Sequence, residues 1–178
     1  MAKQYDSIND ELAGFIAAQR LFFVATGAAG GHVNLSPKGM DSLRILDPHT
    51  LLWLNTTGSG NETAAHVRET PRMTLMFCAF EGRPLILRLY GRATVIHPRD
   101  PEWPVLLGHF PPLPGARQIF RLEVELVQTS CGMAVPLFDY QGEREALNDW
   151  ARNKGPAGIE AYWREKNATS LDGKPTGI

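Results

Sequence analysis

The sequence predicts a mainly β protein with flanking helices, built on a small closed or split antiparallel β-barrel. Six or seven apolar segments have the length of strands, and few helical segments lie between them. Most of the links are short turns rich in Gly, Pro, Asn and Asp, which favours antiparallel pairing because parallel strands need long crossovers. At 178 residues the chain is long enough to bury a complete hydrophobic core.

The N-terminal half of the chain predicts one helix and two hairpins. Apolar residues recur at helical spacing over Ser7–Arg20, and Ser7 with Asp10 is expected to cap this helix. The strands of the two hairpins are expected at Leu21–Thr26, His32–Leu35, Leu43–Leu46 and Leu51–Leu54. Turns that contain Gly or Pro separate the two strands of each pair.

Longer strands are expected in the middle of the chain. A helix over residues 58–69, ended by Pro71, precedes them. The strands are expected at Met73–Phe80, Leu85–Val95 and Phe120–Leu126. The first is continuously apolar, which predicts burial on both faces, whereas the other two alternate apolar with polar residues, which predicts one exposed face. Residues 98–114 hold six of the thirteen prolines and are expected to form a loop with one short helix.

The C-terminal part, residues 131–178, is expected to be a helical tail of the same domain. Its elements are expected as helices at Arg144–Asn153 and Ile159–Lys166, separated by Gly155-Pro156, and an extended arm at Asn167–Ile178. Trp150 and Trp163 lie at packing positions and are expected to anchor the tail on the barrel. The domain is thus divided into an N-terminal helix over residues 1–20, the barrel over 21–130 and this tail.

Composition and charge narrow the range of functions. Lys and Arg number 18 against 19 Asp and Glu, which gives a formal net charge of −1 and does not favour a nucleic-acid partner. No apolar run is long enough to span a bilayer, and the first residues lack the apolar core of a signal peptide. With only two cysteines, Cys78 and Cys131, we expect a reduced, cytoplasmic protein that does not act on membranes.

Two short motifs could carry chemistry. In the first, a strand ends, a Gly/Ser/Thr loop follows, and a helix begins after Ser59 and Asn61; Ser59 with Glu62 has the spacing of a capping box. The free N–H groups of such a helix start can bind phosphate, although a well-capped helix without a ligand explains the same pattern. The second motif is Asn34-Leu35-Ser36-Pro37-Lys38-Gly39, in which two polar side chains on one strand face precede a lysine. It could hold a ribityl phosphate or be an ordinary turn.

Several other reactive residues have a structural interpretation at least as good as a functional one. The five histidines show no paired metal-ligand spacing, so no metal site is expected, and His66 is expected at a surface or interface. Cys78 lies in an apolar strand and is expected in the core. Cys131 is expected to be buried and inert rather than a reactive thiol.

Six segments, taken in order, carry a resemblance to a known family. They are Leu21–Thr26, Asn34–Gly39, Leu52–Asn55, Gly58–Thr63, Pro71–Phe77 and Leu89–Ala93. In this order and spacing they resemble the FMN-binding split-barrel family of pyridoxamine 5′-phosphate oxidase-like proteins, over roughly residues 21–128. Members of this family are homodimers with two FMN sites at the subunit interface, which the resemblance implies here.

The resemblance also implies which residues contact the cofactor. The implied FMN-binding residues are Asn34, Ser36 and Lys38 for ribityl and phosphate, Trp53 and Leu54 for the flavin ring, and Ser59 and Asn61 for phosphate. Thr57 is added on its chemistry alone. The loop lacks the basic residues of the oxidase itself, so Lys38, free N–H groups and an arginine such as Arg44 are expected to hold the phosphate.

The function expected from this resemblance is that of an FMN-dependent oxidoreductase acting on an unknown small molecule. Flavin chemistry needs few protein acids and bases, so no catalytic residue is predicted. Arg88 and Arg92 could steady an anionic flavin or a substrate carboxylate, or lie on an ion-paired sheet face. Residues 167–178 show no counterpart of the oxidase's basic, Trp-containing segment, which argues against pyridoxamine phosphate as substrate. Alternatives are a non-catalytic flavin or haem binder, a deazaflavin-dependent reductase, and an interaction module without cofactor.

Overall fold

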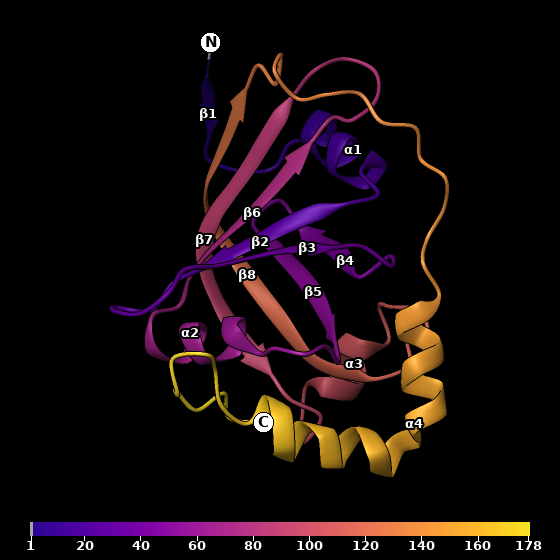
Figure 1. Cartoon of the computed structure of the whole chain (residues 1–178). Coiled ribbons are helices and arrows are strands. Elements are labelled where there is room, and N and C mark those ends of the chain that lie inside the picture. The colour runs from indigo at the N-terminus through magenta and orange to yellow at the C-terminus, as the bar shows by residue number, and fades with distance from the viewer. Residues whose placement is uncertain (1) are drawn as a thin grey trace.

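The computed structural model describes residues 2–178 and is organised around one antiparallel sheet (Figure 1). Its strands are β1 (Lys3–Tyr5), β2 (Phe22–Thr26), β3 (Asn34–Lys38), β4 (Leu43–Asp47), β5 (Thr50–Thr56), β6 (Arg72–Cys78), β7 (Ile86–Ile96) and β8 (Ala116–Ser130). They pair in the order β3-β2-β6-β7-β8-β5-β4, and β1 pairs with the far end of β8. Within the described residues β3 and β4, at the two ends of this order, do not pair, so the barrel is split between them as expected.

The helices gather at the two ends of the sheet. They are α1 (Asp10–Ala18), α2 (Glu62–Glu69), α3 (Trp103–Leu107), α4 (Ala146–Tyr162) and a π-helical turn, η1 (Trp163–Asn167). In Figure 1 α1 lies at one end, and α2, α3 and α4 lie at the other. Among residues 2–178, none of the helices combines the length and hydrophobicity that crossing a lipid bilayer requires.

Both predicted hairpins form: residues 27–33, which are rich in glycine, connect the strands of the first, and a short turn at His49 connects those of the second. Val24 pairs with Ser36 in the first hairpin, and Leu43 pairs with Trp53 in the second. The second strand begins at Asn34 rather than at His32. This pairing places the polar side chains of β3 at one edge of the split, and the aromatic side chain of β5 on the strand next to β4, which forms the other edge.

The main core lies on the concave face of the sheet and is closed by α1. The Trp53 and Phe120 rings stack with centroids 4.8 Å apart, and Leu12 and Ile16 of α1 join the same cluster. A second cluster lies on the opposite face of β5, where Leu54 and its neighbours pack against α3. Strand β5 is therefore buried on both sides, which holds its position in the sheet rigidly.

Strand β6 was predicted to be buried on both faces, and this prediction is wrong. Met73, Leu75 and Phe77 are buried, but Thr74 and Met76 are only half-buried. The reason is that the core lies on one side of β6, and no helix of the described chain covers the other side.

Strand β8 begins earlier and ends later than predicted, and its alternation changes phase at a bulge. Tyr90 pairs with Leu126 while Gly91 pairs with Val124, so one extra residue is inserted in β8. Beyond this point Val127 is buried and Leu126 is not, contrary to the predicted run of alternation. A side chain at residue 91 does not fit, because a Cβ there would lie 1.9 Å from the Glu123 carbonyl oxygen.

Helix α1 is capped by a different residue from the one predicted. It starts at Asp10, so Asn9 is its N-cap, and the Asn9 side-chain oxygen accepts a hydrogen bond of 2.9 Å from the Leu12 N–H. Ser7 lies two residues too early for this role.

The C-terminal tail folds back on the molecule instead of forming an extended arm. Helix α4 kinks at Gly155 and Pro156, as predicted. After η1, Thr169 and Pro175 form a bridge and Thr176 is fully buried, so residues 167–178 make a closed turn beside α2 (Figure 1). Trp163 anchors the tail, since its indole N–H donates a 2.7 Å hydrogen bond to the Thr57 hydroxyl.

Two of the reactive residues lie in other environments than expected. Cys78 is buried, as predicted, but Cys131 is exposed, because β8 ends at Ser130 and the chain then runs over the surface. His66 is buried, not at the surface, since α2 turns it toward β2, where Nδ1 lies 3.1 Å from the Thr26 hydroxyl.

Candidate functional site

A cavity of about 340 Å³ opens between β3, the end of β5 and the loop before α2. Its lining residues are Asn34, Ser36, Pro37, Lys38, Trp53, Asn55, Thr56, Gly58, Ser59, Gly60, Asn61, Glu62, Thr63 and Arg117. Strand β3 contributes one face, β5 the floor, and the loop the opposite wall. The two motifs singled out in the sequence therefore meet across one cavity.

Six of the eight predicted cofactor-binding residues line this cavity: Asn34, Ser36, Lys38, Trp53, Ser59 and Asn61. Leu54 does not, because neighbours on a strand point to opposite faces, and its side chain packs against α3. Thr57 does not either, since its hydroxyl donates to the Gly115 carbonyl at 2.7 Å and accepts from Trp163. Both residues hold the walls of the site in place.

The polar face of β3 is tied to α2 through side chains. The Ser36 hydroxyl donates to the Asn34 side-chain oxygen at 3.1 Å, and the Asn34 amide donates to the Thr63 hydroxyl at 3.2 Å. Asn34 and Ser36 thus share the face that the alternation predicts. Their amide and hydroxyl groups offer a polyol both donors and acceptors.

Lys38 lies at the end of β3, with its ammonium group 5.1 Å from the centroid of the Trp53 ring. Burial, together with the nearby Arg117 charge, lowers the pKa of Lys38 to about 8. The desolvated ammonium has an aromatic ring below it and a second cation close by.

Arg117 is the residue of the site that the sequence analysis missed. Its side chain is only 2 % exposed, and burial lowers its pKa to about 10. It donates to the Asn167 side-chain oxygen at 2.7 Å and to the Gly60 carbonyl at 3.0 Å, while its Nε is buried without a partner. The only sequence signal for a role of Arg117 is that an arginine stands at the start of an apolar strand. The direction of its side chain depends on a register shift between β5 and β8.

The loop before α2 is not the capping box that the sequence predicted. Asn61 is the N-cap position of α2, and its side chain makes no capping hydrogen bond. Glu62 makes no hydrogen bond to the loop in the described chain, because its carboxylate accepts the Leu171 N–H at 2.9 Å. The start of α2 therefore keeps free N–H groups on the cavity side.

The two cations of the site form no ion pair in the described chain, and Glu62, the one carboxylate that lines the cavity, accepts the Leu171 N–H instead. Within residues 2–178, no carboxylate lies within ion-pair distance of Lys38 or Arg117. Two desolvated cations that repel each other are costly unless an anion joins them. A phosphate monoester carries nearly two negative charges at pH 7 and three acceptor oxygens, which fits both cations and the free N–H groups.

The shifted pKa of Lys38 predicts how phosphate affinity depends on pH. The protonated ammonium attracts the phosphate dianion and the neutral amine does not, so affinity should fall as pH rises above about 8. The phosphate group itself stays a dianion over this range. We expect titrations of a phosphate monoester between about pH 7 and pH 9 to show this fall, and a Lys38→Met variant to bind weakly without it. An unchanged pH profile in the variant would assign the titration to another group.

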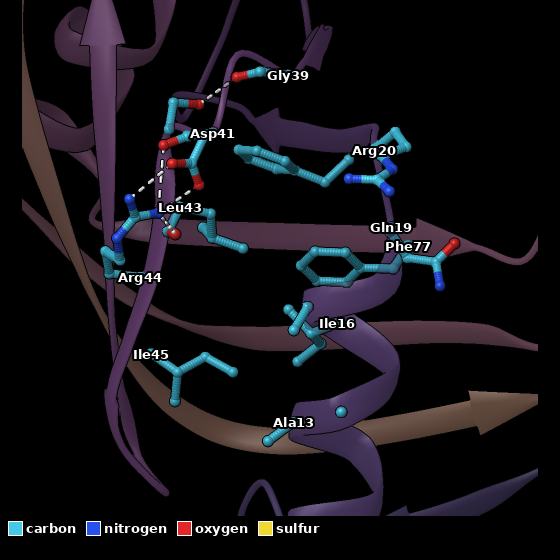
Figure 2. A pocket seen from close by; sticks show the side chains of 14 residues that line it. Ala13, Ile16, Gln19, Arg20, Gly39, Asp41, Leu43, Arg44, Ile45 and Phe77 are labelled. Carbon is cyan, nitrogen blue, oxygen red and sulfur yellow. Dashed lines mark hydrogen bonds and ion pairs between the residues drawn. The ribbon is translucent and has the colours of Figure 1, made fainter. Parts of the chain in front are cut away.

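A second, larger hollow of about 530 Å³ lies between α1 and β4 (Figure 2). Its walls are mostly apolar, with Ile16, Leu43 and Phe77 among them. None of the predicted cofactor residues lines it. Arg44, expected to help hold phosphate, lines this hollow and not the cavity at Lys38, and its guanidinium binds the Asp41 carboxylate at 2.7 Å. That expectation is wrong because Asp41, three residues before Arg44, neutralises it.

Arg88 and Arg92 were considered as possible partners of an anionic flavin ring. They lie on β7 and do not line the cavity that contains Lys38 and Arg117. Arg88 is half-buried and donates to the Ser130 hydroxyl at 3.3 Å. Arg92 is exposed. Neither shares a contact with Lys38 or Arg117 in the described chain.

Comparison with known proteins indicates the family to which this chain belongs. The family model of pyridoxamine 5′-phosphate oxidase matches residues 8–131. A pyridoxamine 5′-phosphate oxidase family protein of Aspergillus flavus is 35 % identical over 191 aligned positions, which cover 96 % of this chain and 76 % of that protein.

Solved structures share the fold. A point variant of HupZ from Group A Streptococcus superposes with a TM-score of 0.56 at 22 % identity, covering 69 % of this chain and 99 % of that one. A candidate pyridoxamine 5′-phosphate oxidase from Lactobacillus delbrueckii gives 0.54 at 23 % identity, with coverages of 69 % and 94 %. With its split barrel, its matched family model and its fungal relative aligned over nearly the whole chain, this protein belongs to the pyridoxamine 5′-phosphate oxidase family.

Proposed function

We propose that this protein binds FMN and acts as a flavin-dependent oxidoreductase on a small molecule. The observation that carries the proposal is the pair of cations that face one cavity, the half-buried Lys38 and the buried Arg117, neither of which has a carboxylate within ion-pair distance in the described chain. The phosphate of FMN supplies the missing charge. Membership of the pyridoxamine 5′-phosphate oxidase family is consistent with a phosphorylated cofactor in this place.

The residues present suit the rest of the cofactor as well. Asn34 and Ser36 offer amide and hydroxyl groups to a ribityl chain, and Trp53 offers an apolar surface. The flavin would supply hydride and electron transfer when bound. The role of the chain is then to hold the phosphate, order the ribityl chain and keep water from the buried floor of β5.

A flavin is favoured over haem at this cavity. The lining contains no histidine, cysteine or methionine, the usual protein ligands of haem iron. A deazaflavin shares the phosphorylated side chain of FMN, so the chemistry of the cavity accepts both. The mass of the bound molecule distinguishes them.

The decisive experiment begins with the protein as purified. Denaturation should release a molecule with the mass of FMN, and the refolded or stripped protein should bind added FMN far more tightly than riboflavin, which lacks the phosphate. Anaerobic addition of a reduced nicotinamide should then bleach the flavin absorbance. Colourless protein that takes up neither FMN nor a deazaflavin would refute the proposal, while bound flavin that no donor reduces would indicate a non-catalytic binder.

We propose further that the active form is a homodimer with its cofactors in the seam. The side of β3 that faces away from the cavity carries Leu35, which is 63 % exposed, next to Val33, which is 77 % exposed. The surface segment after β8 adds further exposed apolar residues, namely Met133, Leu137, Phe138 and Tyr140. An edge strand that carries exposed apolar side chains favours burial against a second copy.

A single charge should break this assembly. Leu35→Arg places a cation in the proposed seam and is expected to shift the particle from dimer to monomer in size-exclusion chromatography with light scattering. Val105 on α3 is 72 % exposed and lies at another face, so Val105→Arg serves as the matched control and should leave the dimer intact. A Leu35→Arg variant that remains dimeric would place the interface elsewhere.

The two cysteines are both free thiols in the described chain. This supports the cytoplasmic location that we propose for the protein, because reduced thiols persist in that compartment.

A further inference from the structure

We infer that Asn167, at the end of η1, is a positioning residue that orients the phosphate-binding groups of the cavity and makes it select phosphorylated flavins. The inference rests on the proposed function and adds to it a residue about 50 positions beyond the nearest other contributor, Arg117. Nothing in the resemblance to other proteins assigned a role to the tail.

Asn167 is fully buried and its side chain uses both polar atoms on the cavity walls. Its amide donates to the Gly58 carbonyl at 3.1 Å and to the Ser59 carbonyl at 3.3 Å. Its oxygen accepts the Arg117 guanidinium at 2.7 Å. One side chain thus contacts both the loop and the buried cation of the anion site.

These contacts fix which way the peptide groups of the loop point. In a planar trans peptide the carbonyl of one residue and the N–H of the next point in opposite directions. The carbonyls of Gly58 and Ser59 are held by Asn167, and that of Gly60 by Arg117. The following N–H groups, those of Ser59, Gly60 and Asn61, are therefore turned to the opposite side, where these residues line the cavity.

Within residues 2–178, these three N–H groups donate to no protein acceptor. Consecutive N–H groups that converge on a hollow form a binding site for an anion. The carbonyls of Gly58 and Ser59 are bonded to Asn167, which does not line the cavity, so these two dipoles do not oppose a phosphate there. The loop and Arg117 thus act together, and both depend on Asn167.

The tail holds Asn167 itself in place. Its backbone carbonyl accepts the Thr176 hydroxyl at 2.6 Å and the Asn61 amide at 3.3 Å. Beyond it, the Leu171 N–H binds Glu62, and Asp172 accepts the His32 N–H at 2.8 Å. These bonds connect the tail to α2 and to the loop before β3, so Asn167 has little freedom to turn away.

The ratio of FMN to riboflavin affinity tests this role. Asn167→Ala removes the bonds to both carbonyls and to Arg117, and should weaken FMN binding by about tenfold or more while riboflavin binding changes little. The matched control is Asn148→Ala, another buried asparagine, which lies on α4 away from the cavity and should leave the ratio unchanged. A purely structural loss would weaken both ligands equally.

The experiment distinguishes a failure of the role of Asn167 from a failure of the proposed function. If the wild-type protein itself does not prefer FMN to riboflavin, the phosphate site as a whole is refuted. If the wild type prefers FMN and Asn167→Ala keeps that preference, only the role of Asn167 is refuted. Should Asn167→Ala fail to fold by circular dichroism, Thr176→Val decides: a reduced ratio supports the role, and an unchanged ratio refutes it.

Discussion

Lys38→Met is expected to weaken FMN binding by about 1.5–3 kcal/mol, roughly ten- to a hundredfold in Kd. The methionine keeps the apolar stem that packs over Trp53 but removes the ammonium group that faces the cavity. Arg117 would remain as the one buried cation of the site. Titration of the stripped variant with FMN, followed by flavin fluorescence, measures the change, and riboflavin should bind as in the wild type.

The matched control for this experiment is Arg44→Met. Arg44 is a cation of β4, but its guanidinium forms an ion pair with Asp41 and does not line the cavity. Its replacement should leave the FMN affinity within about twofold of the wild type. Equal effects of the two variants would mean that general charge, rather than Lys38, attracts the phosphate.

Gly91→Ala is expected to destabilise the apoprotein by about 3 kcal/mol or more, because the new methyl group would collide with the backbone of β8. The added Cβ would lie 1.9 Å from the Glu123 carbonyl oxygen, and a backbone atom inside a sheet cannot move aside as a flexible side chain does. Thermal unfolding should shift down by about 6–12 °C for a chain of this size.

Gly14→Ala is the contrasting substitution. Gly14 lies in α1 with no atom within 4 Å of the added Cβ, so the alanine should stabilise the protein by about 0.5–1 kcal/mol through its higher helix propensity. The same substitution, glycine to alanine, is thus expected to lower the free energy of unfolding at residue 91 and to raise it at residue 14. A Gly91→Ala protein as stable as the wild type would show that the bulge opposite residue 91 is absent in solution.

The sequence predicts those parts of the fold and of the site that depend on local patterns. The hairpins follow from their turns, and the alternation in β3 places Asn34 and Ser36 on one face. The same rule explains one error: Trp53 and Leu54 are neighbours on a strand, so only one of them can line the cavity. Helix α4 and its kink were predictable because Gly155-Pro156 interrupts a helical pattern.

The remainder depends on contacts between distant segments. The direction of Arg117 is determined by a register shift between β5 and β8, which no local pattern reveals. Asn167 reaches Gly58 from 109 residues away, so the tail resembles a free arm in the sequence and supports the loop of the cavity only in the fold. Arg44 was misassigned because of a local contact rather than a distant one: its guanidinium forms an ion pair with Asp41, three residues before it.

The distance in sequence between Asn167 and the loop that it orients has a consequence for biosynthesis. Translation proceeds from the N-terminus, so the nascent chain can pair β2 with β3 and fold α2 while Asn167 is still to be added. A nascent barrel would already contain Lys38 and Arg117, but the peptide groups of Gly58 and Ser59 would not yet be oriented by Asn167. If the proposed phosphate site is correct, tight binding of the phosphorylated ligand would become possible only late in synthesis, once the segment that carries Asn167 has docked.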